Sequence, residues 1–185
     1  MNKSRVKIFP GSSICAETML IGDISFGNNC VVHPYVQILA VAGPIIFGEN
    51  CLIEERVQII HRGPPGAATK KGPPLVIGSD NTFEVGCRIE ARKIGNNNIF
   101  ESKSLIGNQV TITDDCIIGA GCKLREESVV GRNSIVYGSN CKIREVEHQL
   151  SRHPDFMDTV SQILYRNHRI LKVTHRHQSS RCHVR

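Results

Sequence analysis

The sequence predicts a mostly β protein in which short strands wind around a three-sided prism, followed by one C-terminal helix. Three observations predict this class. Large apolar residues recur at every sixth position through most of the 185-residue chain. Aliphatic residues are plentiful while Trp is absent and aromatics make up 5%, a composition that suits sheets better than helical bundles. From Pro154 the apolar spacing changes to three and four, which is the period of a helix.

The six-residue period defines a set of core anchors. A period of six matches neither one continuous helix nor one continuous strand. It fits a chain that makes a short strand, bends and repeats, so that three strands complete one coil and each coil bonds to the next at about 4.8 Å. Twenty anchors then predict between six and seven coils and a prism roughly 30 Å tall. The anchors are Ile8, Ile14, Leu20, Phe26, Val32, Ile38, Phe47, Ile53, Ile59, Ile77, Phe83, Ile89, Ile94, Phe100, Ile106, Ile112, Ile118, Leu124, Val130 and Val136.

Small residues and glycines mark the corners of this prism. The position four residues after an anchor is mostly small, and glycine often follows an anchor directly, where a side chain is unwelcome or φ is positive. Bulk and glycine at these spacings are typical of the hexapeptide-repeat class of parallel β-helix, and likeness to that class implies left-handed coiling. Five cysteines fall on the small inward position, and we predict that they are buried as small hydrophobes. They are Cys30, Cys51, Cys87, Cys116 and Cys122.

The breaks in the period divide the chain into domains. The stretch "IHRGPPGAATKKGPPL" (60–75) interrupts the anchors and holds four prolines, so it must leave the prism. We predict a β-helix domain over 5–143 with an extruded loop at 60–74. A C-terminal segment and helix, 144–173, should pack on the prism, and a basic disordered tail should occupy 174–185.

The predicted helix covers roughly 154–173. Pro154 suits a helix start, and Asp155 and Asp158 suit its first turn. An isolated amphipathic helix is poorly stable in water, so its apolar face should lie on one flat sheet of the prism. The apolar positions are Phe156, Met157, Val160, Ile163, Leu164 and Leu171.

Charge and hydropathy limit the partners. The formal net charge is +6, and the chain from Arg166 to Arg185 is basic without any acid. No aromatic residues suited to base stacking are interleaved there, so we interpret it as a solvated tail and expect no nucleic-acid partner. No segment approaches the roughly 20 apolar residues of a membrane span, and no signal peptide is evident. We therefore expect a soluble intracellular protein with reduced thiols.

The fold and the residue types suggest three enzymatic interpretations: acyl transfer, a zinc site between subunits and a metal site in the tail. Many hexapeptide-repeat proteins are trimeric acyltransferases with a histidine base near an extruded loop, and His61 opens the loop here. However, neither an oriented partner nor a substrate groove is evident for that base. The stretch "GPPGAATKK" lacks the Gly-Lys-Ser/Thr of a phosphate loop. Four residues of the tail are suited by type to bind zinc or copper, but their spacing does not match that of a zinc finger and no rigid element supports them. This set is His175, His177, Cys182 and His183.

The second interpretation is a zinc site. The segment "LIGDISFGNNCVVHPYVQILA" (20–40) resembles a region of the gamma carbonic anhydrases, which bind zinc between subunits through three histidines. Ile21 stands where that family has arginine. Alignment by eye places Leu39, Val85 and Glu90 at the three ligand positions, and His33 near a non-ligand position. The sequence therefore predicts no catalytic, cofactor-binding or metal-binding residues.

Four motifs together resemble the dynactin subunit 6 family. They are "AGPIIFGENCLIEE" (42–55), "IGSDNTFEVGC" (77–87), "IGNNNIFESKSLIG" (94–107) and "CIIGAGC" (116–122). The likeness runs from about residue 5 to residue 172 and includes the interrupting loop and the final helix. It implies a left-handed β-helix and a non-catalytic structural or adaptor subunit of dynactin's pointed-end complex, supporting dynein-driven microtubule transport and cargo binding.

The same resemblance implies partners and a location. The partners would be dynactin subunit 5, the actin-related protein of the pointed end and dynactin subunit 4, with dynein reached through the assembled complex. The location would be cytoplasmic and microtubule-associated, including the centrosome and kinetochore. Candidate contact surfaces are the 60–74 loop, the outer face of the helix and the prism ends. The alternative is a homotrimeric hexapeptide-repeat enzyme, either an acyltransferase or gamma carbonic anhydrase-like.

Overall fold

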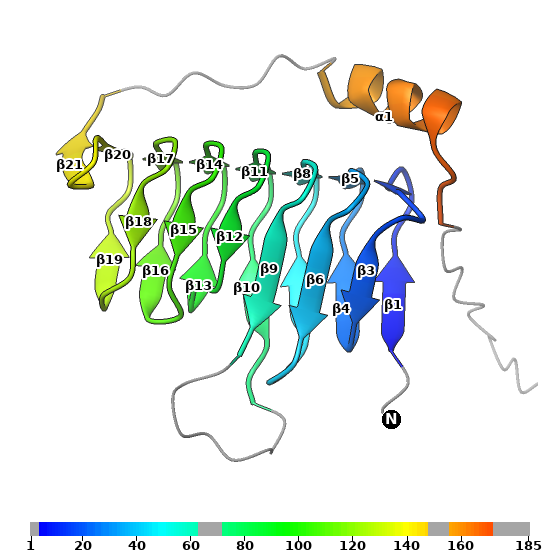
Figure 1. Cartoon of the computed structure of the whole chain (residues 1–185), viewed down its shortest axis with the longest axis horizontal. Coiled ribbons are helices and arrows are strands. Elements are labelled where there is room, and N and C mark those ends of the chain that lie inside the picture. Colours follow the sequence, from blue (N-terminus) through cyan, green and yellow to red (C-terminus); the bar gives the residue numbers. More distant parts are fainter. Residues whose placement is uncertain (1–3, 63–71, 148–155, 172–185) are drawn as a thin grey trace, which may run out of the picture.

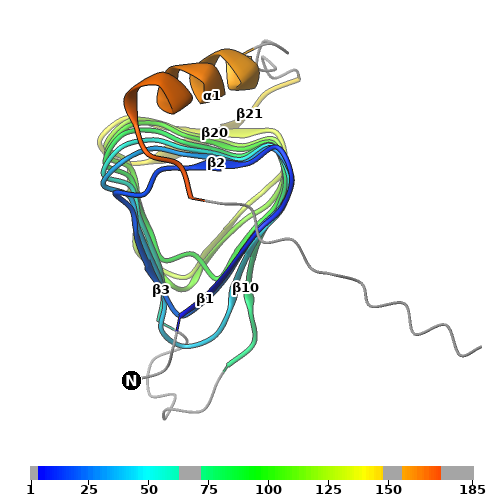
Figure 2. The ribbon, with the colours of Figure 1, turned by 90° about the vertical axis from the view of Figure 1, so that its right-hand side faces the viewer.

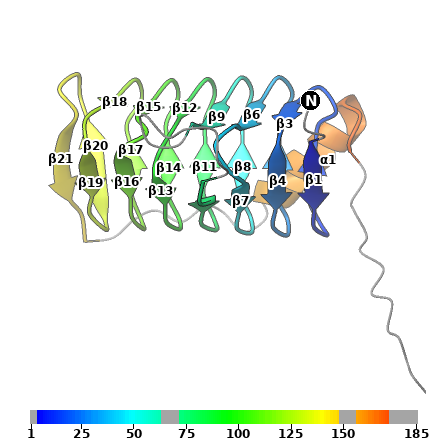
Figure 3. The ribbon, with the colours of Figure 1, turned by 90° about the horizontal axis from the view of Figure 1, so that it is seen from below.

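The chain folds into a left-handed parallel β-helix with three flat faces and one helix lying on one of them (Figures 1 and 2). The structure, a computed structural model, describes residues 4–62, 72–147 and 156–171. Figure 3 shows the coils stacked in chain order, from β1 at one end to β21 at the other. The described strands make six complete coils and most of a seventh, which confirms the predicted fold class.

Each face of the prism is one sheet. The first sheet holds β1 (Arg5–Ile8), β4 (Asp23–Phe26), β7 (Ile45–Phe47), β10 (Leu75–Ile77), β13 (Lys93–Ile94), β16 (Val110–Ile112) and β19 (Ser128–Val130). The second holds β2 (Ser13–Ile14), β5 (Val31–Val32), β8 (Leu52–Ile53), β11 (Thr82–Phe83), β14 (Ile99–Phe100), β17 (Ile117–Ile118), β20 (Ser134–Tyr137) and β21 (Lys142–Glu145). The third holds β3 (Met19–Ile21), β6 (Gln37–Ala40), β9 (Gln58–His61), β12 (Arg88–Ile89), β15 (Leu105–Ile106) and β18 (Lys123–Leu124).

The predicted anchors form the core and stack in register between coils. Ile59 pairs with Ile89, and Ile89 pairs in turn with Ile106. The anchors are buried except for Leu20 and Leu124, which pack partly exposed against the core on the two end strands of the third sheet. Phenylalanine rings also stack between coils, with centroids 5.0 Å apart in one pair on the first sheet and 4.8 Å apart in one pair on the second sheet. The six-residue period therefore predicted the core correctly.

At the corner between the first and second sheets, tight packing and a positive φ occur at different residues, whereas the sequence pattern assigned both to glycine. Gly78 needs no positive φ, but a Cβ there would lie 2.4 Å from the carbonyl oxygen of Gly95 on the next coil. The left-handed backbone region is occupied instead by Asn and Asp, which tolerate it better than other side chains. Asn97 Nδ2 also donates to Asp115 Oδ1 over 2.8 Å. The column of left-handed residues is Asn29, Asn50, Asp80, Asn97, Asp115 and Asn133.

The C-terminal part closes the prism in ways that the sequence did not predict. β21 turns back and pairs antiparallel with β20. The helix, α1 (Phe156–Asn167), ends well before the predicted residue 173, because the chain then pairs with the edge of β2. Ile170 forms an antiparallel bridge with Cys15. Residues 154–155 and 172–173, the tail and most of the 60–74 loop lie outside the described residues.

The helix packs on the second sheet at the β2 end, as Figure 1 shows. Leu164 is buried against Val31 and Leu52, with Met157 and Val160 at the margin. Phe156 and Ile163, which belong to the apolar spacing, stay exposed. Among the described residues, no helix has the length and apolar character needed to cross a membrane.

Replacing Ile118 with Asp tests the frame of the core. The side chain is fully buried in the prism, so the variant buries a carboxylate with no partner. We expect a loss of more than about 4 kcal/mol in the free energy of unfolding, measured by thermal or urea denaturation. Ile117→Asp is the matched control, because Ile117 is half-buried on the outer face of the same strand and should cost about 1 kcal/mol or less. Equal stability of the two variants would contradict the assignment of Ile118 to the core and of Ile117 to the outer face.

The corner column gives a second prediction. Gly78→Ala forces a methyl group onto the backbone of the next coil, and we expect it to cost about 1–3 kcal/mol, as overpacking does. Gly131→Ala is the control, because its nearest atom would be 3.9 Å away, and it should be close to neutral. Urea denaturation of both variants measures the difference, which disappears if the corner is not tightly packed.

Candidate interaction surfaces

The two ends of the prism differ from face to face. The second sheet is covered at both ends by its own chain: β21 covers β20, and the segment after the helix covers β2. There Ala16 N donates to Arg169 O over 2.7 Å, and Leu171 N donates to Ile14 O over 2.8 Å. The first and third sheets end on β1 and β3 at one end and on β19 and β18 at the other, with no further strand among the described residues. Such edges are ready to pair with another chain.

Exposed apolar side chains gather in the first coil, beside two of these edges. Phe9 is 48% exposed, Met19 50% and Ile21 49%. Met19 and Ile21 lie on β3, and Phe9 follows β1. Large apolar groups that remain exposed next to unpaired edges are typical of a protein contact surface. The prediction that the prism ends carry contacts therefore has a physical basis at this end.

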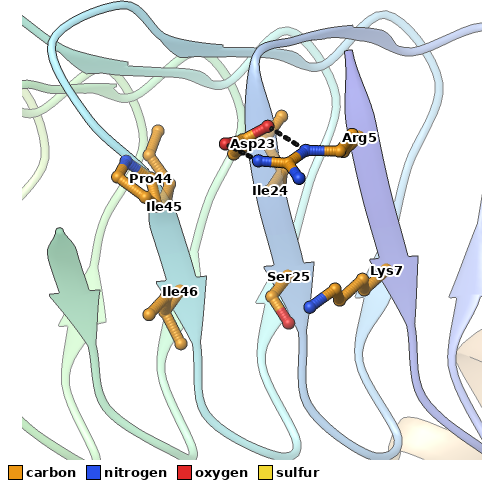
Figure 4. Close-up of a pocket in the computed structure, with 8 residues that line it drawn as sticks. All are labelled: Arg5, Lys7, Asp23, Ile24, Ser25, Pro44, Ile45 and Ile46. Carbon is orange, nitrogen blue, oxygen red and sulfur yellow. Dashed lines mark hydrogen bonds and ion pairs between the residues drawn. The ribbon is translucent and has the colours of Figure 1, made fainter. Parts of the chain in front are cut away.

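A hollow of about 340 Å³ lies on the outer face of the first sheet, across β1, β4 and β7 (Figure 4). The Arg5 guanidinium makes two bonds to the Asp23 carboxylate, of 3.0 Å and 2.8 Å, and Pro44 and Ile46 line the other side. Among the described residues that line the hollow, the one carboxylate is thus held by an arginine, so it is not poised as a general base.

The histidine considered for acyl transfer is engaged by the backbone. His61 Nε2 lies 2.9 Å from the carbonyl oxygen of Pro73, so this nitrogen donates a proton and offers no lone pair to a substrate. His61 ends β9, at the point where the interrupting loop begins. The structure thus places it at the predicted loop but uses it to hold the returning chain.

The three positions compared with zinc ligands do not assemble a histidine cage. Leu39 lies on β6 and offers no ligand atom. Val85 donates its backbone N–H to the carboxylate of Glu54. Glu90 is paired with Arg88 at 2.6 Å and contacts a second arginine at 3.4 Å.

The five cysteines predicted to be buried are all buried, as the six-residue period of the core requires. Their thiols donate to backbone carbonyls at the corners; for example, Cys51 Sγ donates to Gly78 O over 3.2 Å. Burial, together with Cys141 and Glu101, raises the pKa of Cys122 to about 11. A hydrogen bond with Cys51 lowers the pKa of Cys30. The burial of these five side chains confirms the prediction that they occupy the small inward positions.

A left-handed three-sided prism of this kind is the architecture of the hexapeptide-repeat proteins, and comparison with solved structures agrees. A hexapeptide transferase family protein from Anaplasma phagocytophilum superposes with a TM-score of 0.58 at 16% identity, covering 90% of this chain and 95% of that one. The UDP-N-acetylglucosamine acyltransferase LpxA from Bacteroides fragilis gives a TM-score of 0.54 at 14% identity, covering 89% and 82%. These identities are too low to show more than a common fold.

Sequence comparison identifies the family. No protein-family profile matches the chain. Dynactin subunit 6 from Xenopus tropicalis is 40% identical over 173 residues, covering 91% of this chain and 86% of that protein. Dynactin subunit 6 from Danio rerio is 39% identical over 77% of this chain and 74% of its own length. The chain belongs to the dynactin subunit 6 family.

The antiparallel segments that cover the second sheet were not among the elements predicted from the sequence. Ile170 and Leu171 continue the apolar spacing of the helix, so the pattern alone assigned them to it. The turn after Asn167 depends on a contact with Cys15, which lies at the other end of the chain. No local signal could have separated the two.

Thiol reactivity tests the cysteine assignment. At about pH 8, Cys122 should react slowly with a thiol reagent, because burial limits access and a pKa of about 11 leaves roughly one thiolate in a thousand. A thiol pKa raised by folding stabilises the fold fully below about pH 9, and this contribution is lost as the pH rises from about 9 through 11. Half-exposed Cys141 is the internal control. Mass spectrometry after pulse labelling should find Cys141 modified first; labelling of Cys122 at the same rate would contradict its burial.

Proposed function

We propose that the chain is a non-catalytic structural subunit of dynactin that works in the pointed-end complex and supports dynein-driven microtubule transport and cargo attachment. The observation that carries this proposal is the 40% identity to dynactin subunit 6 over 91% of the chain. The similarity therefore extends through the prism and is not confined to one repeat. An assembly subunit needs a rigid shape with specific surfaces, and a packed β-helix supplies both.

The proposed partners are dynactin subunit 5, the actin-related protein of the pointed end and dynactin subunit 4. Dynein would be reached through the assembled complex. The proposed location is the cytoplasm, on the microtubule cytoskeleton and at the centrosome and kinetochore. Membership of the dynactin subunit 6 family supports the assignment to dynactin. The individual partners and cellular locations are proposed in addition.

The proposed contact surface is the first-coil end of the prism. β1 and β3 have no further strand on their outer sides among the described residues, and Phe9, Met19 and Ile21 offer apolar area beside them. The second sheet is closed there by the segment after the helix. A partner at this end therefore meets two open faces and one closed face, which would fix its orientation.

The enzyme alternative rests on the fold shared with transferases. That fold is a scaffold on which catalytic residues are placed or not, so it does not favour catalysis by itself. The two proposals differ in the assembly that they require. An enzyme of this class would form a homotrimer with its reaction site between subunits, whereas a dynactin subunit would bind different chains.

Co-expression with tagged dynactin subunit 5 and the pointed-end actin-related protein tests the proposal. We expect the full chain to co-purify in one stoichiometric complex on size-exclusion chromatography. Met19→Glu combined with Ile21→Glu places charges in the apolar surface and should reduce recovery at least about tenfold. Val129→Glu is the control, because Val129 is 68% exposed at the other end of the first sheet; it should leave recovery unchanged.

The outcomes separate the two parts of the proposal. A stable homotrimer with coenzyme A-dependent acyl transfer, and no co-purification, would overturn the subunit role. Co-purification that resists the paired glutamates but is lost with Val129→Glu would keep the role and move the contact to the other end. Circular dichroism spectra of all variants must match that of the original chain.

A further inference from the structure

Three ligand-type side chains meet where the chain after α1 crosses the first coil. Cys15 Sγ, a Glu17 carboxylate oxygen and His168 Nδ1 all lie within 4.8 Å of one another. The distance from His168 Nδ1 to Glu17 Oε1 is 3.9 Å. Cys15 follows β2, Glu17 belongs to the next corner, and His168 follows α1. The cluster thus joins the two ends of the sequence.

The backbone holds these groups in place from both sides. Ala16 N donates to Arg169 O over 2.7 Å, and His168 N donates to Leu164 O over 2.8 Å. Thr18 Oγ1 donates to the carbonyl oxygen of Cys15 over 2.9 Å. Cys15 itself is buried against Leu164. Ligands carried by a fixed backbone lose little freedom on binding an ion, which favours a preformed site.

His33 lies next to this cluster, on the neighbouring coil. Cys15 N donates to Val32 O over 3.0 Å, and this register places His33 beside Cys15 on the neighbouring coil. The Nδ1 atom of His33 is held by Glu55 Oε1 at 2.8 Å, and its Nε2 atom is buried without a hydrogen-bond partner. An imidazole with one nitrogen fixed by a carboxylate and the other free is the usual arrangement of a metal-ligating histidine. A buried nitrogen left unpaired is otherwise costly.

Binding of a divalent ion would displace the Cys15 thiol proton to solvent as the sulfur–metal bond forms. The Glu17 carboxylate would offset part of the charge of the ion.

We propose that Cys15, Glu17 and His168 bind one divalent transition-metal ion, with zinc preferred, and that this ion fastens α1 to the first coil. Thiolate, imidazole and carboxylate are the ligand types that zinc takes in tetrahedral sites. With bonds of about 2.0–2.3 Å, neighbouring ligand atoms lie roughly 3.3–3.8 Å apart. The observed spacing of up to 4.8 Å is wider, so the exposed Glu17 side chain would have to move toward the other two ligands.

This site differs from the histidine cage considered for the sequence. All its ligands come from one chain, and none stands at a position that was compared with a zinc ligand of the gamma carbonic anhydrases. Its role is to hold the helix on the prism. The proposal does not depend on membership of dynactin, so a zinc result and a co-purification result can fail separately.

Zinc titration of the purified full chain under a thiol-free reductant tests the site. Because His175, His177, Cys182 and His183 could bind metal weakly, the titration uses a full-length background in which these four are replaced by Ala. We expect one Zn²⁺ per chain after dialysis, by elemental analysis, and a zinc-dependent rise in Tm. Co²⁺ in place of Zn²⁺ should give a thiolate-to-metal charge-transfer band.

Variants of the ligands decide the assignment. Cys15→Ser and His168→Gln should each weaken zinc binding at least about 100-fold and remove the rise in Tm. Cys141→Ser and His61→Gln, which change the same residue types elsewhere on the prism, should leave both readouts unchanged. His168 is partly exposed, so His168→Gln should fold even if Cys15→Ser does not. Failure of the background chain to bind Zn²⁺, or binding that survives His168→Gln, would overturn the proposal.

Discussion

The structure depends on one constraint: each core side chain rests on the side chain at the same position one coil away. Parallel coils in register make this unavoidable, because the neighbour of an anchor along the prism is always another anchor. Bulk must therefore be matched between coils, and the stacked rings of Phe26 with Phe47 and of Phe83 with Phe100 show this matching. Extra residues are tolerated only at corners, as between His61 at the end of β9 and Leu75 at the start of β10.

The same constraint explains how much the sequence could predict. Core anchors such as Ile106 were predictable, because the repeat is local and each hexad states its own position. The column of Asn and Asp was equally local: Asn29, Asp80 and Asp115 each stand three residues after a first-sheet anchor, with positive φ. The sequence therefore contained a local signal for these corner residues, although they were not among the predicted features. The bridge of Ile170 to Cys15 was not predictable, because it pairs the last described segment with the first coil and follows no period.

A solenoid of this kind makes its specific contacts mainly through what its ends leave unpaired. The faces repeat, so one coil looks much like the next, whereas each end is unique. Here the chain closes its second sheet at both ends and leaves the first and third sheets open. Such asymmetry resists indiscriminate end-to-end stacking, since a copy or a partner must fit two open edges and one covered edge at once. A structural subunit of an ordered complex requires this kind of restriction.

The attachment of α1 gives the cluster at Cys15 its physical importance. Few buried side chains join the helix to the prism, chiefly Leu164 against Val31 and Leu52, and a twelve-residue helix has little stability of its own. An ion held by Cys15 and His168 would bind only when the helix is docked, so by linkage it would stabilise the docked state in proportion to its saturation. The segment that closes the second sheet follows directly after His168. The occupancy of one metal site would then set how firmly that end of the prism is closed.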